Sequence, residues 1–233
     1  MTDVGTKNQS TRDAWVATRL AALPVGTRLL DAGAGERQYE KYCTHLNYTS
    51  QDFCAYDGAG DGVGLQCTGW KATGVDVISD IVRMPFACES FDAVLCTEVL
   101  EHVYDPIAAL RELIRVLVPR GVLIVTAPFC CLTHQAPHFY HTGFSEYFYR
   151  RFSKENGMMI SEVAPNGNFF EWLAQELRRV PTMVRKYTGG AYPAGTENLM
   201  HVALESLGLY SEADTGSSAM LSYGLQIVMV KNE

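Results

Sequence analysis

The sequence predicts an α/β fold in which a mostly parallel sheet is covered by helices on both faces. Strand-like and helix-like patterns alternate along the chain, as they do where helices join parallel strands. The apolar residues 122–125 are typical of a strand buried on both faces. Residues 27–31 read as a short strand that ends in an acidic residue and a glycine-rich turn, which is where open α/β sheets bind ligands.

The expected elements follow in order along the chain. A helix is predicted at residues 14–23, and strands at 27–31, 47–51, 75–78, 91–96 and 121–127. Residues 106–117 form a helix, because Ile107, Leu110 and Leu113 recur at helical spacing after Pro106, which suits a first turn. The remaining predictions are a helix at 144–156, a strand at 158–163, helices at 169–186 and 196–207, and a final strand at 223–230.

Residues 164–221 read as a helical insertion between the last two strands. We expect the whole chain, residues 1–233, to form a single domain of which this insertion is a part. The insertion is expected to cap the active site or to build a homodimer contact.

Composition narrows the classes of function. The formal net charge is −7, which provides no basic surface for a nucleic acid and argues against such a substrate. No apolar run approaches the ~18 residues of a membrane span, and the polar N-terminus lacks the apolar core of a secretory signal. Seven cysteines without C-x-x-C spacing favour a reduced, cytoplasmic setting.

The glycine turn does not fit a nicotinamide dinucleotide well. That fingerprint is G-x-G-x-x-G, but Gly33 and Gly35 are followed by Glu36, Arg37 and Gln38, so the third glycine is missing. Glu36 would also place negative charge beside a pyrophosphate. A cofactor without phosphate that carries an ammonium group and a positive charge fits better, and S-adenosylmethionine is such a cofactor.

Four motifs in order resemble those of class I S-adenosylmethionine-dependent methyltransferases, in the small-molecule branch that includes quinone-biosynthesis enzymes. They occupy residues 31–35, 48–52, 75–86 and 91–103, and the resemblance is good over roughly residues 28–128. It implies a doubly wound, Rossmann-like, seven-stranded mixed sheet with helices on both faces. One departure is Arg37, where many relatives have a further glycine, so the helix after the turn is expected to start late or irregularly.

The resemblance also implies a set of cofactor-binding residues. The first motif would hold the methionine part of the cofactor, and Asp52, after the second strand, the ribose. Asp80 and Ile81 would meet the adenine, and Thr97 and Glu98 would line the pocket. The spacing of Asp52, about 20 residues beyond the turn, independently suits a ribose-binding carboxylate. The residues so assigned are Asp31, Ala32, Gly33, Gly35, Asp52, Phe53, Asp80, Ile81, Thr97 and Glu98.

A short acidic turn is a candidate metal site. Glu98, Glu101 and His102 fall at i, i+3 and i+4, so a helix would place them on one face, and their side chains suit a divalent metal. Some quinone O-methyltransferases and small-RNA methyltransferases use this turn in that way, while other relatives with the same letters bind no metal. The alternative is that Glu98 faces the cofactor pocket while Glu101 and His102 form hydrogen bonds within the fold. No metal ligand is therefore assigned from the sequence.

The loop after the fifth strand, residues 129–148, contains three histidines. Loops at this edge of such sheets carry function, and a histidine can accept a proton near neutral pH. We take His138 and His141, ahead of His134, as candidates for the general base. One alternative is that these histidines are hydrogen-bonded and order the loop. Another is that they join His102 in a metal site.

The predicted function is methyl transfer from S-adenosylmethionine to a hydroxyl oxygen of a small molecule. The irregular turn and the histidine loop resemble methyltransferases found with polysaccharide-assembly enzymes, which suggests a sugar or lipid-linked glycan first and a quinone or polyketide phenol next. Two alternatives stay open. One is a catalytically silent methyltransferase-like subunit that binds the cofactor, and the other is an NAD-dependent oxidoreductase, which the missing glycine disfavours.

Overall fold

The computed structural model describes residues 2–191 and 193–233, and the chain divides into two compact units. The sheet unit comprises Ala14–Ala164 and Gly224–Glu233. The helical unit comprises the N-terminal segment up to Asp13 and Pro165–Tyr223. Among the described residues, no helix has the length and apolar character needed to cross a membrane.

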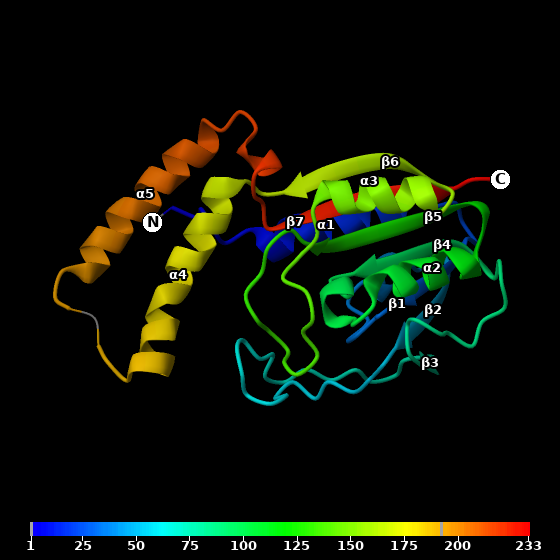
Figure 1. Cartoon of the computed structure of the whole chain (residues 1–233), viewed down its shortest axis with the longest axis horizontal. Coiled ribbons are helices and arrows are strands. Elements are labelled where there is room, and N and C mark those ends of the chain that lie inside the picture. Colours follow the sequence, from blue (N-terminus) through cyan, green and yellow to red (C-terminus); the bar gives the residue numbers. More distant parts are fainter. Residues whose placement is uncertain (1, 192) are drawn as a thin grey trace. The chain divides into compact units, whose positions relative to one another are not determined.

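A seven-stranded mixed sheet has the order β3-β2-β1-β4-β5-β7-β6. β1 pairs in parallel with β2 and β4, β2 with β3, and β4 with β5, whereas β7 pairs antiparallel with β5 (Figure 1). The strands are β1 (Arg28–Ala32), β2 (Asn47–Asp52), β3 (Val77–Ile78), β4 (Phe91–Thr97), β5 (Leu117–Pro128), β6 (Met158–Asn166) and β7 (Gly224–Lys231). The predicted fold class is confirmed, and each predicted strand is present.

Alternate residues of the central strands feed two hydrophobic cores, one on each face of the sheet. On one face, Leu30 and Val94 pack with α2 (Pro106–Val116) and α3 (Glu146–Glu155). On the other, Leu29 and Leu95 pack with Val16 of α1 (Asn8–Ala21). Figure 1 shows α2 and α3 in front of the sheet and α1 behind it. Because successive strand residues point to opposite faces, neighbouring apolar residues such as Leu29 and Leu30 supply both cores.

The start of α2 is fixed by its sequence. The Asp105 carboxylate accepts a hydrogen bond from the backbone N–H of Ala108 at 2.9 Å, and Pro106 occupies the first helical position, where a missing N–H costs nothing. Leu110 and Leu113 are fully buried, as the predicted apolar spacing requires. This helix therefore directs the chain from the end of β4 back to the start of β5.

Two segments of the sheet unit are irregular. After the glycine turn, the described residues between β1 and β2 contain no α-helix, only the 3-10 turn η1 (Glu40–Tyr42). Arg37 has a φ of +58°, a left-handed conformation that favours glycine, which explains why a regular helix does not begin there. Residues 53–76, which we term the β2–β3 segment, likewise contain neither helix nor strand in the structure.

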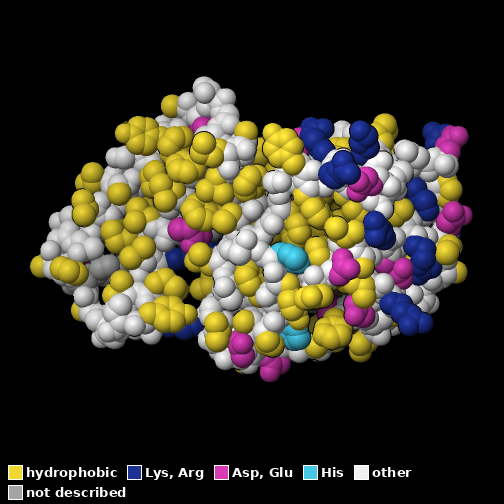
Figure 2. Space-filling model, viewed as in Figure 1, with side chains coloured by type: hydrophobic (Ala, Val, Ile, Leu, Met, Phe, Trp, Pro, Cys, Tyr) yellow, Lys and Arg dark blue, Asp and Glu magenta, His cyan; other side chains and the backbone are white. Residues whose placement is uncertain are grey.

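The helical unit contains α4 (Phe169–Thr188) and α5 (Thr196–Glu212), which pack against each other. Asn168 caps α4 by accepting from the backbone N–H of Glu171 at 3.0 Å. The Glu171 carboxylate in turn accepts from the Gly5 backbone N–H at 2.7 Å and the Tyr223 hydroxyl at 2.8 Å, which ties together three distant parts of the chain. Figure 2 shows hydrophobic side chains gathered over these helices, and the exposed ones include Leu199, Val202 and Leu209. A capping or dimer role for this unit stays a prediction.

Candidate functional site

The glycine turn after β1 is folded back onto the end of β2. The backbone N–H groups of Gly33 and Ala34 both donate to the carbonyl oxygen of Gln51, at 2.8 and 2.9 Å. Gly33 and Gly35 have φ values of +74° and +53°. A Cβ atom at Gly33 would meet the Val99 side chain at 2.4 Å, so this position has both the conformation and the close approach that require glycine.

Asp31, at the end of β1, is buried beneath this turn. Its Oδ2 atom accepts a hydrogen bond from the Tyr48 hydroxyl at 2.7 Å, whereas Oδ1 is buried and has no hydrogen-bond partner among the described residues. Burial raises the pKa of Asp31 to about 7; the Tyr48 hydrogen bond lowers it in part, and the nearby Asp52 carboxylate raises it further. The site thus contains a carboxylate that an ammonium group would satisfy.

Asp52, at the end of β2, faces the same turn. Its Oδ2 accepts from the backbone N–H of Gly35 at 2.9 Å, and its Oδ1 accepts from that of Cys54 at 2.7 Å. Each oxygen retains a lone pair, so the carboxylate is fixed in place and can still accept from a vicinal diol such as a ribose. The next residue, Phe53, is 56% exposed, as a residue in contact with a bound ligand would be in the free protein.

Of the two candidate residues that follow the third strand, one is exposed and the other is buried. Asp80 is exposed, and its Oδ1 accepts from the Val82 backbone N–H at 3.0 Å. Ile81 is instead buried, and its side chain packs in the hydrophobic core with Met84. Ala32 is also fully buried in β1. Contacts of Asp80 and Ile81 with the adenine remain predictions.

At the end of β4, Thr97 is half-buried and Glu98 turns toward β5. The Glu98 backbone N–H donates to the Thr126 carbonyl oxygen, and its Oε1 accepts from the Thr126 hydroxyl, both at 2.9 Å. Glu98 has a φ of +53°. The chain does not continue as an α-helix from this residue, so the expected common face of Glu98, Glu101 and His102 does not form. Glu98 consequently lies outside the group of potential metal ligands described next.

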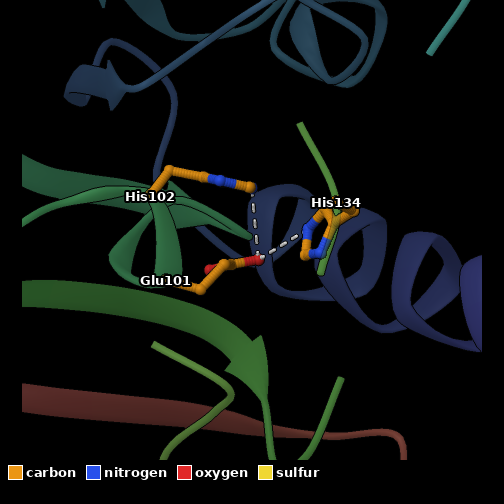
Figure 3. A group of neighbouring side chains, drawn as sticks. All are labelled: Glu101, His102 and His134. Atoms are coloured by element: carbon orange, nitrogen blue, oxygen red, sulfur yellow. Dashed lines mark ion pairs between the residues drawn. The ribbon is translucent and has the colours of Figure 1, made fainter. Parts of the chain in front are cut away.

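Glu101 and His102, in the 3-10 turn η2 (Leu100–His102), lie beside His134 from the loop after β5 (Figure 3). One ligand atom from each residue lies within 4.8 Å of the other two. The nearest imidazole nitrogens are 3.7 Å (His102) and 3.8 Å (His134) from Glu101 Oε1. Burial lowers the pKa of His102 to about 4, with a further decrease from His134, so this imidazole is neutral at physiological pH.

The two candidate bases differ in their surroundings. The His138 ring packs edge-on against Phe53, with ring centroids 6.0 Å apart, which places it beside the residue that follows Asp52. His141 Nε2 lies 3.3 Å from the Tyr104 carbonyl oxygen, and the His141 ring contacts Phe144. His138 therefore lies beside Phe53, and His141 is held against Tyr104, after the η2 turn. Their roles as bases remain predictions.

The β2–β3 segment covers the glycine turn, a contact that no pattern in the sequence predicts. A Cβ atom at Gly35 would meet the Trp70 ring at 2.6 Å, so this ring lies directly against the turn. The Lys71 backbone N–H donates to Glu36 Oε1 at 3.0 Å, and the Arg37 guanidinium donates to the Gly74 carbonyl oxygen. The only available signal was the series of glycines at positions 58, 60, 62, 64, 69 and 74, which is typical of an irregular, folded-back segment.

The same segment contacts the histidine loop. Leu65 and His134 form an isolated parallel bridge, and the backbone N–H of Gln135 donates to the Leu65 carbonyl oxygen at 2.8 Å. Figure 1 shows the two segments side by side, in cyan and yellow-green. The segment over the glycine turn and the histidine-bearing loop therefore form one connected surface at the carboxyl ends of the strands.

Sequence comparison identifies relatives with a named activity. Residues 30–125 match the family described as a methyltransferase domain. The demethylmenaquinone methyltransferase of Mycobacterium sp. (strain KMS) is 32% identical over 169 residues, which cover 72% of this chain and 67% of that protein. The enzyme of the same name from Mycolicibacterium paratuberculosis is 31% identical over 166 residues, or 71% and 66% of the two chains.

Solved structures share the fold at lower identity. A SAM-dependent methyltransferase from Archaeoglobus fulgidus has a TM-score of 0.57 and 12% identity, covering 96% of this chain and 94% of that one. The cyclase SpnF has a TM-score of 0.55 and 19% identity, covering 96% and 82%. Since a cyclase has this architecture too, the structural likeness shows the fold alone.

The assignment of function therefore depends on the sequence relatives, and the site agrees with them. The orphaned, buried Asp31 oxygen and the fixed Asp52 carboxylate suit the ammonium and ribose groups of S-adenosyl-L-methionine. The mycobacterial relative is 32% identical to this chain over 67% of its own length. The protein therefore belongs to the class I S-adenosylmethionine-dependent methyltransferases and methylates a small-molecule acceptor.

Proposed function

We propose that the acceptor is a reduced quinone and that the methyl group is transferred to a ring carbon. The observation that carries this proposal is the 32% identity to a demethylmenaquinone methyltransferase over 169 residues. The sequence alone favoured a hydroxyl oxygen of a sugar, but the relatives shift the preference to a planar aromatic ring.

The chain's own residues would orient the cofactor. Asp31 would accept from its ammonium group and Asp52 from the ribose hydroxyls, while the backbone of Gly33 and Gly35 allows close approach. The sulfonium of S-adenosylmethionine supplies an already activated methyl group. The protein therefore mainly aligns donor and acceptor for in-line displacement.

His138 is the residue that we expect to assist the acceptor. It packs edge-on against Phe53, next to the ribose-binding position. A histidine there can accept the hydroxyl proton of a hydroquinone, which increases electron density on the ring carbons, or the proton that the methylated carbon must lose. Phe53, which is largely exposed, offers an aromatic face to a planar ring.

A phenolic hydroxyl is the second candidate acceptor. The position of His138 beside Phe53 supports this candidate too, because a base there would accept the proton of a phenolic hydroxyl group. The two candidates differ in the atom that is methylated, and a product analysis separates them.

The test is a transfer assay with S-adenosylmethionine that carries a deuterated methyl group and a chemically reduced, prenylated dihydroxynaphthalene as acceptor. We expect a singly methylated product whose label lies on a ring carbon by NMR. A labelled methoxy group would instead support the phenol, and transfer only to a sugar hydroxyl would overturn the proposal. Binding of S-adenosylhomocysteine without transfer to any of these acceptors would favour a silent cofactor-binding subunit.

A further inference from the structure

We propose that Glu101, His102 and His134 form a binding site for a divalent transition metal ion such as Zn²⁺. The three side chains come from two loops at the carboxyl ends of β4 and β5 and converge on one point (Figure 3). Glu101 is fully buried, and both histidines are mostly buried. The convergence of these three groups differs from the Glu98-containing set that the sequence spacing indicated.

The hydrogen bonds of the two imidazoles fix which nitrogen can bind a metal. His102 Nδ1 lies 2.6 Å from the His138 carbonyl oxygen, and His134 Nδ1 lies 2.9 Å from the Leu132 carbonyl oxygen. A carbonyl oxygen only accepts, so in each neutral ring Nδ1 carries the proton and Nε2 presents a lone pair. This is the arrangement found around metal-bound histidines, whose other nitrogen donates to a carbonyl or carboxylate.

Both Nε2 atoms face the same carboxylate oxygen. They lie 3.7 and 3.8 Å from Glu101 Oε1, which is too far for direct hydrogen bonds. A cation bound between these three atoms would accept both imidazole lone pairs and the carboxylate oxygen as ligands. A metal with bonds of about 2.1 Å to such ligands would fit after the side chains close by roughly 1 Å.

The set of ligand atoms indicates the class of metal. Two imidazoles and one carboxylate suit Zn²⁺ or Fe²⁺ better than Mg²⁺, which prefers oxygen ligands. Three protein ligands also leave a coordination position open, as in catalytic zinc sites. Because His138 supplies the carbonyl that holds His102 and its ring contacts Phe53, the site adjoins the proposed acceptor position.

The role of the ion rests on the proposed function. An acceptor oxygen bound at the open position would lose its proton to water more readily, since a bound divalent ion lowers the pKa of an oxygen ligand. Metal binding itself requires neither acceptor nor cofactor, so it can be tested separately.

The experiment measures Zn²⁺ affinity by competition with a chromogenic chelator, using the full chain and the variants His134→Gln and Glu101→Gln. We expect the wild type to bind one ion per chain with high affinity. Each variant should weaken binding by more than about 100-fold, because losing a residue that only supports a ligand costs up to about 100-fold and losing a ligand costs more. The matched control is His201→Gln, which removes an exposed histidine 3.9 Å from Glu205 and is expected to leave affinity unchanged.

No high-affinity ion in the wild type, or equal affinity in His134→Gln, would overturn the proposal. His134 lies in a loop, so this variant stays informative if Glu101→Gln fails to fold. Binding of S-adenosylhomocysteine, measured on the same samples, separates the outcomes. Cofactor binding without metal binding rejects the metal site alone, whereas metal binding without methyl transfer to a quinol rejects the proposed acceptor alone.

Discussion

The Tyr48 hydroxyl donates a 2.7 Å hydrogen bond to Asp31 Oδ2 directly beneath the glycine turn. This bond stabilises the ionised form of a carboxyl that burial drives toward protonation. The balance leaves the pKa of Asp31 at about 7, so the charge of the cofactor site changes near neutral pH.

Cofactor affinity should therefore depend on pH. Only ionised Asp31 attracts an ammonium group, and the ionised fraction grows about tenfold between pH 6 and pH 8 for a group with this pKa. We expect the affinity for S-adenosylhomocysteine, measured by calorimetry, to rise by a similar factor over that range. Tyr48→Phe should raise the pKa and move the rise to higher pH, and a pH-independent affinity in the wild type would refute the assignment.

Stability of the cofactor-free protein should depend on Asp31 in the opposite direction. Below about pH 4 the carboxyl is protonated in both folded and unfolded states, and between pH 4 and 7 only the unfolded state ionises, so stability falls as pH rises. The penalty is about 1.4 kcal/mol per unit of pKa shift. Asp31→Asn should thus gain stability over the wild type at pH 8 but not at pH 4 in denaturant unfolding, while binding cofactor poorly.

Asp52→Ala should abolish cofactor binding. The change removes the proposed ribose acceptor and the oxygens that hold the Gly35 and Cys54 backbone N–H groups. We expect at least a ~100-fold loss of affinity, since several hydrogen bonds to a charged group disappear together. Asp92→Ala is the matched control, because it removes an exposed carboxylate paired with Arg28 at the start of β4. Equal affinities in both variants would show that Asp52 does not contact the cofactor.

Trp70 should report cofactor binding. Its ring lies against Gly35, so a ligand that enters the turn must contact or displace it. We expect a change in tryptophan fluorescence on titration with S-adenosylhomocysteine and its loss in Trp70→Phe. Trp15→Phe serves as the comparison, because the Trp15 indole instead donates to Glu162. Should the signal persist in Trp70→Phe, the ring does not border the bound cofactor.

Gly33→Ala should destabilise the protein through two separable effects. The new Cβ would meet Val99 at 2.4 Å, and alanine is strained at a φ of +74°. Together these should cost about 2 kcal/mol or more in unfolding experiments. Val99→Ala removes the two methyl groups that the new Cβ would meet. Gly33→Ala should therefore cost less stability in the Val99→Ala background than in the wild type. A fully additive pair would show that the two side chains do not collide.

The sheet could be predicted because its strands are encoded locally. Each central strand is apolar on both faces, and α2 carries its own cap and apolar stripe, so residues 91–128 reveal their structure without tertiary information. The acids at positions 31 and 52 could be placed on one edge because parallel strands end there together.

The remainder of the site depends on contacts between segments distant in sequence. Nothing near Trp70 indicates that its ring lies against Gly35, and nothing near Glu101 indicates that His134, from the loop after β5, approaches it. The spacing of Glu98, Glu101 and His102 suggested one helical face, but the left-handed backbone at Glu98 prevents it. Arg37 adopts a φ of +58°, which favours glycine, so the residue type at this position does not reveal its conformation.

The bridge between Leu65 and His134 has a kinetic consequence. The segment that covers the glycine turn is hydrogen-bonded to the loop that bears His134, His138 and His141, so ordering of one segment favours ordering of the other. Addition of the two substrates is then expected to be ordered, with the cofactor binding first and the demethylated cofactor leaving last. Product-inhibition patterns would reveal this sequence, and random addition would mean that the two loops move independently.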